Sequence, residues 1–158
     1  MKLTYFLTLA AGLVLLLLLS ACKNDSGTEI KVIEYNELII NLDKEVYKPE
    51  ASAHLTIINK TKKDLILLNC GTSPGFDLQK NIVGKWNNVS LMECPNIGQP
   101  FEILQGERRE FDIALPPLSL NPNEVEGQYR LLLWLKDKAS DQFLDKSERA
   151  TDPFRITN

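Results

Sequence analysis

The segment GTSPG at residues 71–75 matches the G-x-S-x-G pattern around the nucleophilic serine of α/β-hydrolases. The oxyanion hole of those enzymes uses the backbone N–H of the residue after the serine, and Pro74 has none. The pattern also requires a following helix, yet no helical periodicity is present, and the single histidine, His54, precedes Ser73 instead of following it. A Gly- and Pro-rich turn is therefore the favoured interpretation, and we predict no catalytic residue.

The other titratable side chains suggest no metal site. His54 lies on the polar face of a predicted strand, and a single imidazole is a poor basis for a His-based zinc site. Asp137, Asp141 and Asp145 recur every four residues and could contact calcium, but lysines are interspersed and a Gly-turned calcium loop is missing from the sequence. We predict a solvated histidine, a solvated aspartate-rich loop, and neither metal nor cofactor.

Cys22 has the most specific chemistry in the sequence. Met1 and Lys2 precede an uncharged apolar stretch, Phe6–Leu19, and small residues follow it, which predicts a secretory signal peptide over residues 1–21. The longer uncharged stretch Leu3–Ala21 could span a membrane, but no basic stop-transfer cluster follows it. Leu19-Ser20-Ala21-Cys22 resembles the lipobox of bacterial lipoproteins, which implies cleavage before Cys22 and a lipid on that residue. The resemblance implies that the protein is anchored in the cell envelope. Lys23, which follows the cysteine, favours the outer membrane if the organism is Gram-negative.

The mature chain, residues 22–158, has the length of one domain. Residues 22–29 are polar and small and are interpreted as a flexible tether, which leaves residues 30–158 for the domain. Because the signal peptide contains a single charge, Lys2, the mature chain is more acidic than the net charge of −3 of the full sequence. An acidic chain without basic clusters argues against a nucleic acid as partner.

Two cysteines remain in the mature chain, Cys70 and Cys94. Export places them in an oxidising compartment, where an even number of cysteines usually forms disulfides. A redox or metal pair is the alternative, but the sequence has no C-x-x-C motif and one histidine. We predict a structural disulfide that closes a loop of about 25 residues and contributes ~3 kcal/mol.

Short apolar or alternating runs, separated by turn residues at intervals of roughly 8–12 residues, predict an all-β sandwich or barrel. Alternation is strongest in Ala51–Asn59, Arg109–Leu115 and Gly127–Lys136, where every second residue is apolar and is expected to face the core. Turns are expected at Tyr47–Glu50 and residues 71–75. Further strands are predicted at Ile30–Tyr35, Leu38–Leu42, Leu65–Leu68, Phe76–Gln79, Lys85–Met92 and Pro153–Ile156.

Tyr129 follows a proline-rich connection and opens a strand, which is where immunoglobulin-like sandwiches have a tyrosine corner. Its ring is expected to pack inward while its hydroxyl forms a hydrogen bond with nearby backbone.

Four segments, taken in order, resemble bacterial immunoglobulin-like domains of small exported proteins: LDKEVYKPEASAHLTIIN, GKWNNV, EGQYRLLLWL and DPFRI. There is also a looser likeness to a bacterial proteinase-inhibitor sandwich family. The resemblance implies a single sandwich of about 7–9 antiparallel strands. The cysteine pair departs from both families, so function is not transferred with the fold.

Two regions are candidate contact surfaces. Leu132 and Trp134 point away from the expected core, so either other segments cover them or they form an apolar interaction patch. Pro95 and Asn96 lie in the loop beside Cys94. We predict a non-catalytic binding or accessory module whose partner is an envelope protein or a glycan. The alternative is a proteinase inhibitor that presents the disulfide-tied, proline-bearing loop.

Overall fold

The computed structural model describes residues 37–89, 94, 96–118 and 124–157. The predicted signal peptide, Cys22, the tether, the predicted strand Ile30–Tyr35, and Pro95 lie outside the described residues.

The described residues form strands and no α-helix, and among them no helix is long and apolar enough to span a bilayer. The strands are β1 (Leu38–Leu42), β2 (Val46–Tyr47), β3 (Ser52–Asn59), β4 (Leu65–Leu67), β5 (Asn69–Cys70), β6 (Ser73–Pro74), β7 (Phe76–Ile82), β8 (Lys85–Asn88), β9 (Phe101–Ile103), β10 (Arg108–Ala114), β11 (Gly127–Leu133), β12 (Leu135–Asp137) and β13 (Phe154–Ile156).

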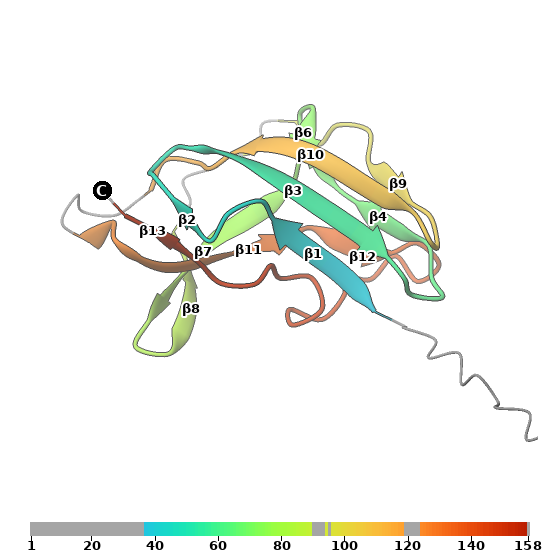
Figure 1. Cartoon of the computed structure of the whole chain (residues 1–158). Coiled ribbons are helices and arrows are strands. Elements are labelled where there is room, and N and C mark those ends of the chain that lie inside the picture. Colours follow the sequence, from blue (N-terminus) through green and yellow to red (C-terminus); the bar gives the residue numbers. More distant parts are fainter. Residues whose placement is uncertain (1–36, 90–93, 95, 119–123, 158) are drawn as a thin grey trace, which may run out of the picture. The chain divides into compact units, whose positions relative to one another are not determined.

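The strands form two main layers (Figure 1). One sheet has the order β1-β3-β10, and the other has the order β2-β13-β11-β7-β8. A third sheet, β12-β4-β9, connects the layers, because β12 continues β11 of one layer while β9 leads into β10 of the other. The predicted all-β sandwich is confirmed. The two-residue strands β2, β5 and β6 raise the number of described strands above the expected 7–9. In addition, β2 pairs with β13 in parallel, where antiparallel pairing was expected.

The hydrophobic core lies between the two layers because each sheet buries every second residue. Ala53, Leu55 and Ile57 of β3 face the core, as the alternation predicts. From the facing sheet, Leu78 and Leu131 are paired across β7 and β11 and are also fully buried. The same alternation leaves a second, outward side on each sheet, and these outward sides carry polar residues together with a few aromatic ones.

Tyr47 lies in a strand, and the prediction that it belongs to a turn is wrong. Tyr47 belongs to β2, is buried, and its ring packs against Phe154 of β13 with centroids 5.4 Å apart. Its hydroxyl accepts from the Lys44 N–H at 3.0 Å and donates to the Asp43 carboxylate at 2.7 Å. Two residues are too short a strand to show alternation, so the sequence pattern could not reveal it.

Tyr129 forms the predicted tyrosine corner. Its side chain is fully buried, and its hydroxyl donates to the backbone carbonyl of Val125, four residues upstream. Burial raises the pKa of the Tyr129 phenol to about 12. The hydrogen bond holds the start of β11, the strand that carries much of the outer face described below.

Candidate binding face

The outer face of the five-stranded sheet is built by the alternation of β7, β8 and β11. Gln79 and Arg130 are paired across β7 and β11, next to the core pair Leu78 and Leu131, and so they point to the opposite side. The register of β7 with β8 places Trp86 on this same side. We call this surface the outer face, and two clusters of side chains lie on it.

The first cluster centres on Arg130. Its guanidinium carbon lies 4.5 Å from the centroid of the Trp86 ring, and its Nε donates to Oε1 of Gln79 at 2.9 Å. Burial lowers the pKa of Arg130 from its ordinary value. Among the described residues, Arg130 forms no salt bridge. The cluster is therefore a partly buried cation on an aromatic ring, and no carboxylate of the described part of the chain forms an ion pair with it.

The second cluster centres on Trp134, which is half-buried and lies outside the core cluster, as predicted. Its indole Nε1 donates to the Asp77 carboxylate at 3.3 Å. The ring lies against Gly75, where a β-carbon would overlap it. The Trp134 backbone N–H donates to the Gly75 carbonyl at 2.8 Å, and the Trp134 carbonyl accepts from Leu68 at 3.0 Å. Backbone bonds on both sides therefore fix the position of the indole.

Phe143 extends the second cluster towards β12. Its side chain is 50% exposed, and it is paired with Lys136 through an isolated antiparallel bridge. The Lys136 ammonium and the Arg149 guanidinium lie 5.3 Å and 5.1 Å from the centroid of the Phe143 ring. Arg149 also donates to the carbonyls of Leu144 and Leu133, at 3.0 Å and 2.5 Å. Two cations are thus held beside one exposed ring.

For Leu132, the structure decides between the two alternatives that the sequence left open, and it favours coverage by other segments. Leu132 lies outside the core cluster but is only 2% exposed, so its side chain is not available to a partner. Asp77 and Ala150 oppose it on the two neighbouring chain segments, and Arg130 and Trp134 flank it along β11. With neighbours on all four sides Leu132 is covered, so Trp134 alone of the predicted pair contributes accessible surface.

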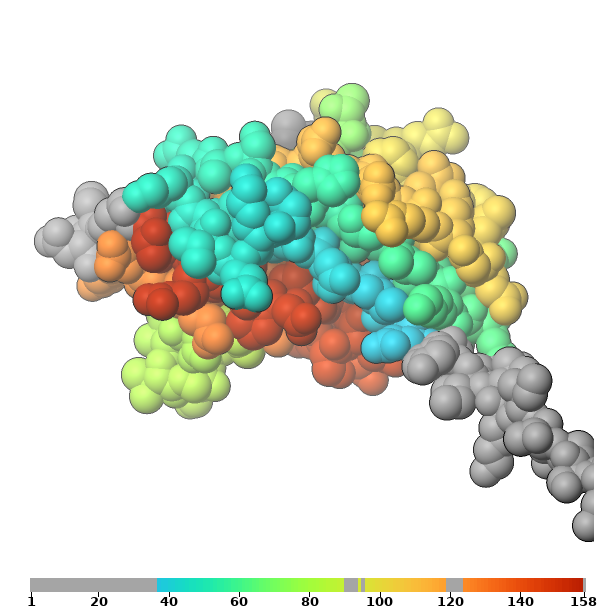
Figure 2. All heavy atoms as spheres, in the orientation of Figure 1, coloured from blue at the N-terminus to red at the C-terminus, as the bar shows by residue number. Residues whose placement is uncertain are grey.

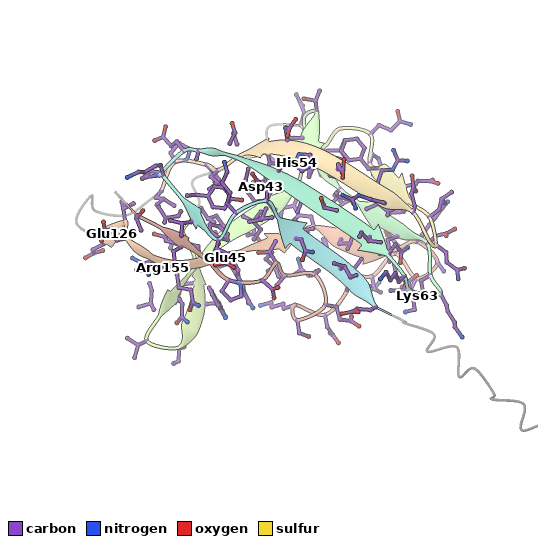
Figure 3. All side chains as sticks on the ribbon, in the orientation of Figure 1. Asp43, Glu45, His54, Lys63, Glu126 and Arg155 are labelled. Atoms are coloured by element: carbon purple, nitrogen blue, oxygen red, sulfur yellow. A yellow bond between two sulfur atoms is a disulfide. The ribbon has the colours of Figure 1, made fainter. Side chains whose placement is uncertain are left out.

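The outer side of the other sheet has a different character. His54 Nδ1 lies 2.9 Å from Oδ1 of Asp112, its partner in register on β10, and His54 Nε2 lies 3.8 Å from Oε2 of Glu110. The hydrogen bond with Asp112, and then the neighbouring negative charges, raise the pKa of His54. The His54 backbone N–H donates to the Asp43 carboxylate at 2.8 Å (Figure 3). His54 is partly exposed, on an acidic surface.

The disulfide between Cys70 and Cys94 is present, with the two Cα atoms 5.2 Å apart. It ties β5 to the loop that contains the candidate contact residue Asn96. The Asn96 carbonyl accepts from the Gly71 N–H at 3.0 Å, and the Asn69 side chain donates to the Gln99 carbonyl. Asn96 itself is exposed. The loop is held to the sheet end at three points, and Asn96 is the candidate residue that it presents.

The three aspartates that recur along the chain have separate roles. Asp137 is buried, pairs with Lys63 at 2.9 Å, and accepts from the N–H groups of Ala139 and Ser140. These contacts lower the pKa of Asp137, and they correct the expectation that it lies solvated in a loop. Asp141 pairs with Lys136 at 2.9 Å, whereas Asp145 is exposed. Among the described residues, no group of three or more His, Cys, Asp or Glu side chains is placed to hold a metal ion.

Ser73 of the G-x-S-x-G segment lies in β6, paired with Cys70 of β5. The predicted turn is present, because the chain reverses between β5 and β6 at Gly71, which has a positive φ of 65°. His54, in β3, directs both ring nitrogens towards the carboxylates of β10. The structure thus pairs the ring nitrogens of the single histidine with Asp112 and Glu110.

A groove also runs between β1 and the C-terminal segment, as Figure 2 shows for the blue and red residues. It contains two adjoining cavities of about 560 and 570 Å³, which share Asn41 and Asp152 in their linings. Charges of both signs line it, including Lys63 and Glu148 in the first cavity and Arg155 in the second. This mixture does not favour a partner of either sign.

The comparisons with known proteins give no family. No protein-family model matches the chain, and no curated protein matches it. Among solved structures, the DNA-bound alkylpurine DNA glycosylase AlkC of Pseudomonas fluorescens aligns at 7% identity and a TM-score of 0.38, over 77% of this chain and 30% of the other. The sporulation control protein Spo0M of Bacillus subtilis aligns at 14% identity and a TM-score of 0.35, over 77% and 49%. The chain spans less than half of either protein, and no activity is transferred from them.

Proposed function

We propose that the protein is a lipid-anchored, non-catalytic binding module of the bacterial cell envelope, with an immunoglobulin-like domain. The lipobox at Cys22 supports the anchor, and the tyrosine corner at Tyr129 supports the domain type. The observation that carries the binding role is the outer face, where Arg130 lies on the half-buried Trp86 ring and forms no salt bridge with any described residue. A second half-buried indole, Trp134, lies on the same face and donates to Asp77. Aromatic and arginine side chains are enriched where proteins bind partners.

The proteinase-inhibitor alternative depends on the loop at Glu93, Cys94, Pro95 and Asn96. Glu93 and Pro95 lie outside the described residues. The contacts of Asn96 tie the loop to the sheet but do not favour a protease over any other partner. The inhibitor function stays a prediction, and a panel of purified proteases, assayed with micromolar protein, tests it directly.

Cross-linking from native envelopes tests the binding role. The full-length protein, with a C-terminal tag, is cross-linked in intact envelopes and purified. We expect a specific cross-linked component that is lost with Arg130→Gln. Arg108→Gln is the matched control, because Arg108 lies on the opposite sheet and carries the same charge. A component that is equally abundant with both variants, or no component at all, would contradict the proposal.

A further inference from the structure

The arginines of the described residues divide into two groups. Arg108 and Arg109 of β10 pair with Glu110 and Glu107, at 2.5 Å and 2.6 Å. Arg130, Arg149 and Arg155, which belong to the other layer or to the segment that leads into it, form no salt bridge with another described residue. The full chain has a net charge of −3, whereas this layer carries three arginines without a salt bridge to a described residue. The Asp77 carboxylate lies on the same side, where it accepts from Trp134 and attracts Arg149, so Arg130 is the arginine best placed to meet an anion.

Two of these arginines are held in place and are partly desolvated. Arg130 is fixed by Gln79 and the Trp86 ring, and Arg149 by two backbone carbonyls and the Phe143 ring. Burial lowers the pKa of both guanidinium groups, yet an arginine stays charged at neutral pH. A charge that is positioned in advance and has lost part of its hydration gains from an incoming anion.

The outer face is also long and carries aromatic rings at both ends. Trp86 lies opposite Asn81 of β7, and Trp134 lies beside Gly75, just before the first residue of that strand. Six residues of strand separate these positions, which corresponds to about 20 Å. The amide groups of Gln79, Asn81 and Gln128 lie between or beside the rings, and Asn81 donates to Gln128 at 3.1 Å.

We infer that the outer face binds an anionic glycan, a chain of sugar rings that carry carboxylate groups. The ring faces of Trp86 and Trp134 suit stacking on sugar rings, the planar amides suit hydrogen bonds to hydroxyls, and Arg130 suits a carboxylate. The inference rests on the proposed binding function and names its ligand class. The groove beside β1 has charges of both signs and lacks this complementarity.

A polyuronate serves as the probe. Binding of polygalacturonic acid to the purified full-length protein is measured by calorimetry, with dextran as the neutral polymer. We expect binding to polygalacturonic acid and none to dextran. Arg130→Gln should weaken binding about tenfold or more, because it removes a charge-assisted contact, whereas Arg108→Gln should change it less than about twofold. Trp86→Ala, which removes the half-buried ring beside Arg130, gives a second test if Arg130→Gln unfolds the protein.

Two further polyanions separate a glycan site from a general attraction for negative charge. Polyphosphate and single-stranded oligo(dT) are titrated under the same conditions, and Trp86→Ala is tested against each. We expect polygalacturonic acid to bind more tightly than polyphosphate. We also expect Trp86→Ala to lower the affinity for polygalacturonic acid about tenfold. Tighter binding of oligo(dT), or of polyphosphate independently of Trp86, overturns the inference, as does an absence of polyuronate binding.

Failure of this inference is distinct from failure of the proposed function. If polygalacturonic acid does not bind while envelope cross-linking still depends on Arg130, the outer face binds another class of partner and the glycan assignment is wrong. If envelope cross-linking is also unchanged by Arg130→Gln, the proposed binding role of the outer face is wrong as well.

Discussion

At the scale of the residue, the Tyr129 hydroxyl offers the simplest test of the fold. The ring is fully buried, and the hydroxyl donates to the Val125 carbonyl. Tyr129→Phe keeps the ring but leaves a part-buried carbonyl without its donor, so we expect the free energy of unfolding to fall by about 1–2 kcal/mol. Urea denaturation measures this change. A difference below about 0.3 kcal/mol would show that the hydroxyl does not act as a tyrosine corner.

His54 gives a prediction on pH. Its hydrogen bond with Asp112, followed by the charges of Asp112 and Glu110, raises its pKa above the ordinary value of 6.5. The folded chain therefore binds the His54 proton more tightly than the unfolded chain does, and protonation of His54 stabilises the fold. This contribution to stability is fully present below pH 6.5 and is lost as the pH rises through the folded-state pKa. Because the chain has one histidine, an NMR titration reports this pKa without overlap.

Asp112→Asn is the variant that tests the cause of this shift. It removes the charge but keeps a side chain of the same size, so we expect the His54 pKa to move back towards 6.5. We also expect the variant to lose more stability at about pH 5.5 than at about pH 8. A His54 pKa that does not change with Asp112→Asn would mean that the ion pair on β10 is absent in solution.

At the scale of the element, alternation made the long strands predictable. β3 pairs along its whole length and buries every second residue, so its sequence carries the period of two. β10 pairs with β3 along its whole length and shows the period where Phe111 is half-buried and Ile113 is buried. β2, β5 and β6 have two residues each, which is too short for a period, and they contain or adjoin turn residues. The parallel pairing of β2 with β13 depends on where the chain crosses between layers, which no local pattern encodes.

The candidate site was predictable only in part, for a related reason. Trp134 was expected on the outward side, and it lies there. Trp86 and Arg130 come from strands separated in the sequence, and the register with β7 brings them together. Alternation cannot tell how much of an outward side chain its neighbours cover, and so the sequence left open whether Leu132 is covered or available to a partner.

The disulfide is the element-scale constraint with the largest expected effect. Cys70 and Cys94 are 24 residues apart, and the bridge restricts the unfolded chain by closing that loop. We expect the double variant Cys70→Ser and Cys94→Ser to lose about 3 kcal/mol of stability. Chemical denaturation of both proteins under non-reducing conditions measures the loss.

Addition of a reductant provides the control for this prediction. It should lower the stability of the natural chain towards that of the double variant and leave the variant unchanged. If the natural chain and the double variant were equally stable without reductant, the Gly71–Asn96 and Asn69–Gln99 hydrogen bonds would be enough to hold the loop at Cys94.

At the scale of the whole molecule, a small net charge conceals two unlike sides. On the outward side of the β1-β3-β10 sheet, Asp112 and Glu110 flank one histidine and Arg108 is paired with Glu110. On the outward side of the other sheet, Arg130 and Arg155 form no salt bridge with a described residue, and Asp77 accepts from Trp134. Whole-chain charge predicted only that a nucleic acid is a poor partner. The separation of charge appears once the strands assign each residue to a side, and such a separation orients a molecule towards a charged partner.

Attachment to a membrane is the remaining whole-molecule property, and Cys22→Ala tests it. Each buried methylene of an acyl chain contributes about 0.8 kcal/mol to membrane binding, so a lipid with two or more chains on Cys22 would hold the protein stably, while the described domain offers no membrane-spanning helix. We expect the natural chain to fractionate with membranes and to take up labelled fatty acid, and Cys22→Ala to lose both properties. The double variant Cys70→Ser and Cys94→Ser should retain both, because its lipidation site is intact. A Cys22→Ala protein that still fractionates with membranes would show that the anchor is not a lipid on this cysteine.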